Sequence, residues 1–95
     1  MQIDSVIDTI VEELHEKLGH PDIDAEARKI VSKLEEAHYN PGDVTPLADC
    51  IIAILLAGRS QGFSPSKVFE AVTKVCENVA GRDWKRMPDG TYHVQ

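Results

Sequence analysis

The sequence predicts an all-α fold, a small bundle of four helices. Two observations predict it. Apolar residues recur three and four positions apart in four successive segments. The breaks between these segments carry Gly, Pro and Asn, which end helices and form turns. With 95 residues the chain is long enough for one domain and too short for two. We therefore expect residues 1–95 to form a single helical domain.

The first helix is expected over residues 1–19. Its apolar positions form one stripe, and Gly19 is expected to end it. After a break at His20 and Pro21, a second helix is expected, with Asp24 as its N-cap. The segment 40–43, Asn-Pro-Gly-Asp, is typical of a turn.

The third expected helix begins near Val44 or Thr45, with Pro46 in its first turn, where a missing N–H costs nothing. From Leu47 to Ala57 it is apolar almost all round, apart from one carboxylate. Such a helix is buried on most sides. The other helices of so short a chain would hardly enclose it, so we expect a homodimer to complete the bundle.

A fourth helix is expected to begin at Ser64 and Pro65, as N-cap and first helical residue, and to end at Gly81. The segment 83–95 is expected to be an irregular tail with a turn at Asp89-Gly90. Trp84, the chain's one tryptophan, would either stack on a base or pack against the bundle as a clasp.

Charge and composition exclude several classes of function. Sixteen Asp and Glu against ten Lys and Arg leave a formal charge of −6, with no basic face for a nucleic-acid polymer or an anionic membrane. The most apolar run is far shorter than the ~20 residues of a membrane-spanning helix, and the N-terminus has no signal-peptide pattern. Cys50 and Cys76 lie in apolar helical stripes, so we expect reduced core cysteines and a cytoplasmic location.

Asp49 is a lone carboxylate near the start of the most apolar helix. One interpretation is that it faces the positive end of the helix dipole and solvent. The other is that it reaches a polar seam between helices, where carboxylates hold a divalent cation.

The segment from Lys33 to Ile52, KLEEAHYNPGDVTPLADCII, resembles the core of the MazG-like nucleoside-triphosphate pyrophosphohydrolases. It looks closest to the phage and bacterial subgroup described as dATP/dGTP pyrophosphohydrolase-like. The resemblance extends through the Gly62–Pro65 segment and the spacing Lys-x3-Asn-x3-Arg-x-Trp to the C-terminal Asp-Gly…His-Val, about two-thirds of the chain. It implies a helical domain that binds a nucleoside triphosphate and, with Mg2+, hydrolyses it to monophosphate and pyrophosphate.

The resemblance also implies which residues form the site. The family places an ExxE pair and an ExxD pair on adjacent helices, and these four carboxylates hold magnesium. Here Glu36 and Asp49 match, whereas Lys33 and Pro46 replace the other two carboxylates. Because a lysine repels a divalent ion, the metal site is incomplete, and we expect the Lys33 ammonium to lie between Glu36 and Asp49 instead.

Glu35 and Asp43 are the nearest alternative metal ligands to this incomplete set. The segment Glu12–Glu16 is a literal EExxE, but it lies on the first helix, so we interpret it as a solvated face. No catalytic nucleophile or base is recognisable. The histidines show no ligand-like spacing and are expected at the surface or in turns: His15, His20, His38 and His93.

Lys74, Asn78 and Arg82 are spaced four residues apart, on one expected face of the fourth helix. The resemblance implies that they bind nucleotide phosphates; the alternative is an ordinary polar face. Two hypotheses about function follow. The chain is a nucleotide-binding pyrophosphohydrolase that would use Mg2+ if active, or a catalytically inactive derivative that serves as a dimeric protein-interaction module.

Overall fold

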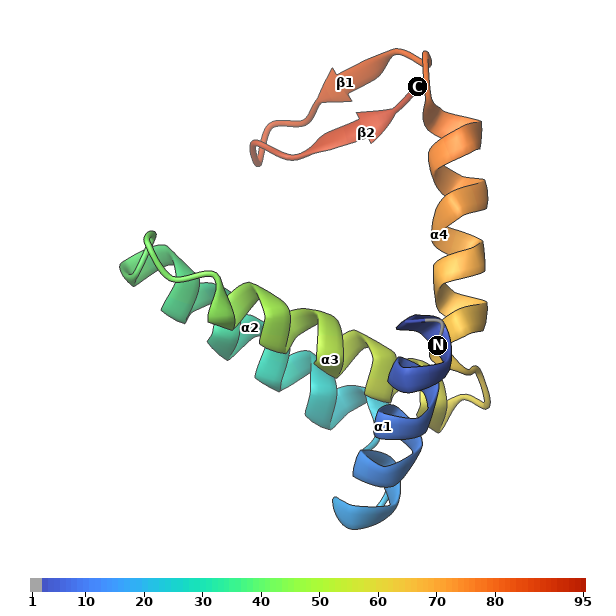
Figure 1. The fold of residues 1–95 in the computed structure, drawn as a ribbon. Coiled ribbons are helices and arrows are strands. Elements are labelled where there is room, and N and C mark those ends of the chain that lie inside the picture. The colour runs from blue at the N-terminus through green and yellow to red at the C-terminus, as the bar shows by residue number, and fades with distance from the viewer. Residues whose placement is uncertain (1–2) are drawn as a thin grey trace.

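The computed structural model describes residues 3–95, and side chains from Ser5 onward. The described residues form four helices followed by a short β-hairpin (Figure 1). The elements are α1 (Ile3–Lys17), α2 (Ile23–Tyr39), α3 (Thr45–Ser60), α4 (Pro65–Val79), β1 (Trp84–Arg86) and β2 (Tyr92–Val94). The predicted four helices are thus confirmed; the first two residues of the helix expected over 1–19 lie outside the described part.

Side-chain caps define where α2 and α4 begin. Asp22, and not Asp24 as expected, is the N-cap of α2: its Oδ1 accepts a hydrogen bond from the Ala25 amide at 2.8 Å. Asp22 has the extended backbone that an N-cap requires, whereas Asp24 already lies in the first turn. The expected cap of α4 is confirmed, with Ser64 Oγ accepting from the Lys67 amide at 3.2 Å.

The core lies where α1 crosses α3 and the start of α4. Its centre is formed by Val11, Leu55 and Leu56, which are almost fully buried. The partly buried residues around them come from α1, α3 and α4: Ile7, Leu14, Ile52, Val68 and Phe69. Gly58 allows the close approach of α4 to α3, because a Cβ there would lie 3.1 Å from Val68 Cγ2.

Polar contacts join α1 to the other helices around this core. The Asp8 carboxylate accepts hydrogen bonds from the Ser66 amide at 2.9 Å and the Ser66 hydroxyl at 2.7 Å, in the first turn of α4. Arg59 of α3 forms a two-pronged ion pair with Glu12, including an Nη2–Oε1 distance of 2.9 Å. Both contacts fix the orientation of α1.

Helices α2 and α3 lie side by side as an antiparallel pair (Figure 1). Helix α3 is buried on one side only, through residues such as Cys50 and Ala53. Its other side leaves a line of apolar residues about half exposed: Leu47 at 47%, Ile51 at 52% and Ile54 at 47%. One chain therefore does not enclose this helix.

Only the first half of α4 packs against the rest of the chain. Beyond Phe69 its apolar stripe is exposed, with Val72 at 51% and Val75 at 57%. The expectation that Cys76 is a core residue is therefore wrong, although Cys50 is buried as expected. In Figure 1, α4 projects away from the α2–α3 pair and carries the hairpin at its far end.

The segment 83–95 is not the irregular tail expected from the sequence. β1 and β2 pair antiparallel, with Trp84 opposite Val94. The expected turn residues make the hairpin possible: Gly90 has φ +90°, and Asp89 Oδ1 accepts from the Thr91 amide at 3.0 Å. Trp84 is about half exposed on this hairpin and is not buried as a clasp.

No single described helix is long and apolar enough to cross a membrane; only α3 and α4 taken together pass that test, and they are bent by 108° at their junction.

Candidate functional site

The candidate site lies on the α2–α3 pair, where Lys33 stands between two carboxylates. Its Nζ lies 3.2 Å from Glu36 Oε2, one turn along α2, and 3.3 Å from Asp49 Oδ2 on α3. The antiparallel packing of the two helices brings these residues together. The expected placement of Lys33 between Glu36 and Asp49 is confirmed.

In this cluster an ammonium, not a metal ion, lies between the two carboxylates and offsets one of their two negative charges. Hydrogen bonds to Glu36 and then to Asp49 raise the pKa of Lys33 above its ordinary value of 10.5, so the ammonium stays charged at neutral pH. Two facing carboxylates need a cation or a proton. Here the lysine ammonium supplies that charge, and about a quarter of its side chain is exposed.

The residues around the cluster do not fit a magnesium site. The Pro46 side chain has no ligand atom and is fully buried, so this position presents no ligand. The Asp43 carboxylate is used in the turn before α3 instead: its Oδ1 accepts from the Thr45 amide at 3.0 Å, which lowers the pKa of the carboxyl. Glu35 lines a surface hollow with Val31, Leu34, His38 and Tyr39. A hard divalent cation takes at least six oxygen ligands. Glu36 and Asp49, whose carboxylates are already paired with an ammonium, do not provide such a ligand set.

The three expected phosphate-binding residues do not share one helix face. α4 ends at Val79, and Arg82 follows the left-handed Gly81, where it donates to the Gln95 carbonyl at 3.3 Å. Lys74 and Asn78 lie on α4 and are exposed, with Lys74 Nζ 3.5 Å from Glu70. Beyond its first turns, α4 projects away from the α2–α3 pair (Figure 1), and among the described residues Asp49 pairs with Lys33 and not with Lys74 or Arg82.

The EExxE segment of α1 does not form one carboxylate cluster. Glu12 is bound by Arg59, which lowers the pKa of Glu12, and Glu16 pairs with His20 at 3.1 Å. His15, expected at the surface, is buried, which corrects that expectation. His20, His38 and His93 are exposed as expected. One sequence signal for His15 was available: it falls one turn after the core residue Val11, on the same side of α1.

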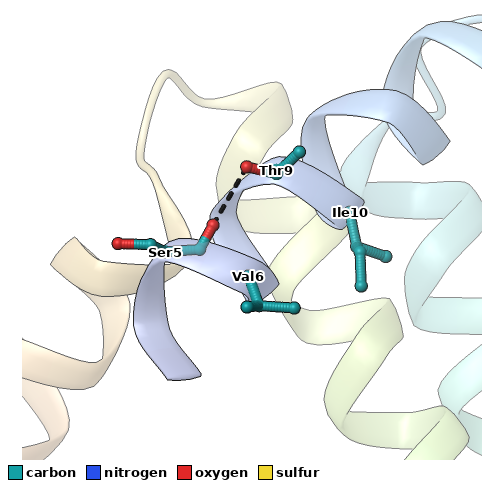
Figure 2. A pocket seen from close by; sticks show the side chains of 4 residues that line it. All are labelled: Ser5, Val6, Thr9 and Ile10. Atoms are coloured by element: carbon teal, nitrogen blue, oxygen red, sulfur yellow. Dashed lines mark hydrogen bonds between the residues drawn. The ribbon is translucent and has the colours of Figure 1, made fainter. Parts of the chain in front are cut away.

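A hollow lies along α1 and is lined by Ser5, Val6, Thr9 and Ile10 (Figure 2). The Thr9 hydroxyl is used within the helix, since Thr9 Oγ1 donates to the Ser5 carbonyl at 3.0 Å (Figure 2). The remaining surface is that of two aliphatic side chains. The hollow therefore lacks the convergent polar groups that orient a small-molecule substrate.

Comparison of the chain with protein-family models, curated proteins and solved structures finds no match. The MazG-like resemblance therefore rests on the sequence motifs alone.

Proposed function

We propose that this chain is a homodimeric helical module that acts by binding protein, built on a MazG-like plan in which a lysine takes the place of the metal ion. The observation that carries the proposal is Lys33, whose ammonium lies within 3.3 Å of both carboxylates that match the family's metal ligands. We place the module in the cytoplasm, because its cysteines are unpaired in the described structure.

The distribution of apolar surface supports the homodimer. Within the described residues, the buried core of one chain is small, whereas fifteen large hydrophobic side chains are exposed. They include the line Leu47, Ile51 and Ile54 on α3 and the stripe of Val72 and Val75 on α4. Contiguous apolar faces of this kind mark protein interfaces. A second copy that covers α3 and α4 would supply the burial that one chain lacks.

Nucleotide binding is the second candidate function. It is supported by the exposure of Lys74 and Asn78, one turn apart on the projecting helix α4, with Arg82 just beyond its end. In a dimer, α4 of one chain would lie near the α2–α3 pair of the other and carry these cations toward Asp49. A nucleoside triphosphate would then meet cations on its phosphates. Hydrolysis to monophosphate and pyrophosphate would still require Mg2+.

Calorimetric titration of dATP and dUTP, each with and without Mg2+, tests the two functions against each other. The module proposal expects no Mg2+-dependent heat and no pyrophosphate release. Saturable binding that is weakened in Lys74→Ala and Arg82→Ala, but not in Lys67→Ala, would establish the nucleotide-binding candidate instead. Lys67 is a matched control, because it is exposed on the same helix and lies 3.9 Å from the same Glu70.

A further inference from the structure

The end of α1 brings two histidines and a glutamate together through its backbone. The His20 amide donates to the His15 carbonyl at 2.9 Å, and the Gly19 amide donates to the Glu16 carbonyl at 3.3 Å. Gly19 has φ +75°. These are the two hydrogen bonds and the left-handed residue of a Schellman motif, which places the side chains at His15 and His20 in contact. The residues just after α1 therefore fold back against the last turn of that helix.

The three side chains converge at this turn. The rings of His15 and His20 stack with centroids 4.5 Å apart and planes 13° apart. His20 Nε2 lies 3.1 Å from Glu16 Oε2. One ligand atom from each of the three residues falls within 4.8 Å of the others. Tetrahedral ligand atoms around zinc stand roughly 3.4 Å apart, given bonds of about 2.1 Å, so small rotations of the exposed Glu16 and His20 would close the set.

His15 supplies the observation that points to a ligand. Its side chain is only 5% exposed, and neither ring nitrogen has a hydrogen-bond partner among the described residues. A Schellman motif ordinarily places an apolar contact here. A buried imidazole instead brings a donor and an acceptor, and leaving them unused is unfavourable. A bound metal ion would use one of these nitrogens.

We propose that His15, Glu16 and His20 bind a divalent transition-metal ion of the zinc class, with water in the remaining position. Imidazole nitrogens suit zinc, cobalt, nickel and copper, whereas Mg2+ prefers oxygen ligands. Glu12 is not part of the set, because Arg59 already holds its carboxylate. The ion would link the last turn of α1 to His20, which lies beyond the end of the helix, and so stiffen the connection between α1 and α2. The site is independent of the function proposed above.

Titration with Co2+ and Zn2+ tests the site in the full chain, freed of any histidine tag and carrying Cys76→Ser so that the exposed thiol binds no metal. We expect one equivalent of Co2+ per chain, with a visible absorption band that Zn2+ abolishes. Zn2+ should raise the melting temperature, and EDTA should reverse the increase. In the His20→Asn variant the affinity should fall at least about tenfold, since even outer-shell partners of metal ligands contribute about 10- to 100-fold.

Asn is chosen at position 20 because it tolerates the left-handed backbone that His20 adopts, with φ 58°. Glu16→Gln is the second variant. The Glu16 side chain is 62% exposed, so this variant should fold even if position 20 is sensitive to substitution. His38→Asn and His93→Asn are the controls and should bind the metals like the parent. The proposal is overturned if the parent binds no Co2+ or Zn2+ at micromolar concentration, or if the two ligand variants bind as tightly as the two controls.

Discussion

Lys33 halves the negative charge of a pair of carboxylates that would otherwise attract a metal ion. Its ammonium contacts one carboxylate from its own helix and one from α3, at 3.2 and 3.3 Å. Removing one side of a partly buried ion pair leaves the other charge without compensation. The side chain therefore contributes to stability through charge, and it also excludes a divalent ion from the same place.

The Lys33→Glu variant is expected to be less stable than the parent at low ionic strength, because three carboxylates then face one another. Millimolar Mg2+ should raise the melting temperature of this variant by linkage and leave that of the parent unchanged. Thermal unfolding with and without Mg2+ measures both effects. Lys85→Glu, an equal charge change on the exposed strand β1, should show neither. A rise in the melting temperature of the parent would contradict the interpretation of Lys33.

Pro46 is left unchanged in that experiment for a structural reason. Restoring the family's fourth carboxylate with Pro46→Glu would place a charge at a fully buried position. An unpaired buried charge is strongly unfavourable. We therefore expect the double variant Lys33→Glu, Pro46→Glu to unfold rather than to recover a metal site.

The ion pair between Glu12 and Arg59 predicts how stability depends on pH. The hydrogen bond from Arg59 lowers the pKa of Glu12 below its ordinary value of 4.5. A carboxyl whose pKa is lower in the folded state than in the unfolded state stabilises the fold at any pH above its unfolded-state pKa. This contribution is lost as the pH falls through its folded-state pKa. The stability difference between the parent and Glu12→Gln should therefore shrink below about pH 4.5.

Chemical denaturation from pH 7 to pH 3 measures that difference. Glu13→Gln is the matched control: Glu13 is the neighbouring exposed residue on α1 and forms no ion pair with a described residue. Its stability difference from the parent should stay small throughout. A constant difference for Glu12→Gln across the acid range would show that the ion pair with Arg59 is not formed in solution.

At the scale of the elements, the orientation of α1 depends on the start of α4. Asp8 accepts two hydrogen bonds from Ser66, so its negative charge sits at the positive end of the α4 dipole. The contact joins residues 58 positions apart in the sequence. No local pattern in α1 distinguishes Asp8 from the other acidic residues on that helix.

We expect Asp8→Ala to lower the free energy of unfolding by about 1–2 kcal/mol, the range for loss of a capping carboxylate. Urea denaturation at one fixed protein concentration measures the loss, since the stability of a dimer varies with concentration. In the double variant with Ser66→Ala the two effects should not add, because both remove the same contact. Additive losses would mean that Asp8 does not cap α4.

At the scale of the whole molecule, the exposed apolar faces of α3 and α4 are the main feature. The principal extents of the chain are 41 × 32 × 26 Å, and α4 and the hairpin extend away from the part formed by α1, α2 and α3. A chain of this size buries a modest core, and self-association is a common way to bury more. The dimer proposed for this chain would use both faces.

The Ile51→Glu variant is expected to sediment as a monomer at micromolar concentration, whereas the parent sediments as a dimer. Ile51 lies in the middle of the exposed line on α3, so a charge there would be buried in the interface. Circular dichroism should show helix retained. Gln61→Glu adds the same charge at an exposed position just after α3 and should remain dimeric. A parent that sediments as a compact monomer would contradict the proposed dimer.

Helical character was decided locally and was predictable from the sequence. The repeat of apolar residues and the break residues placed all four helices, and Ser64-Pro65 and Asp89-Gly90 marked a helix start and a turn correctly. These signals act over a few residues, because caps and turns depend on neighbouring backbone groups. The contact of Lys33 with Glu36 is local in the same sense, because the two residues lie one turn apart on the same helix.

The tertiary structure decided what those local signals leave open. In the folded chain His15 is buried, whereas the direction of α4, which projects away from the α2–α3 pair, leaves Cys76 exposed. The periodicity of a helix tells which residues share a face, but not which neighbour covers that face or how far the cover extends. Which side chains are buried, and which ion pairs form between helices, depends on the angles at which the helices cross and on contacts between residues far apart in the sequence. Both are therefore decided by the tertiary packing.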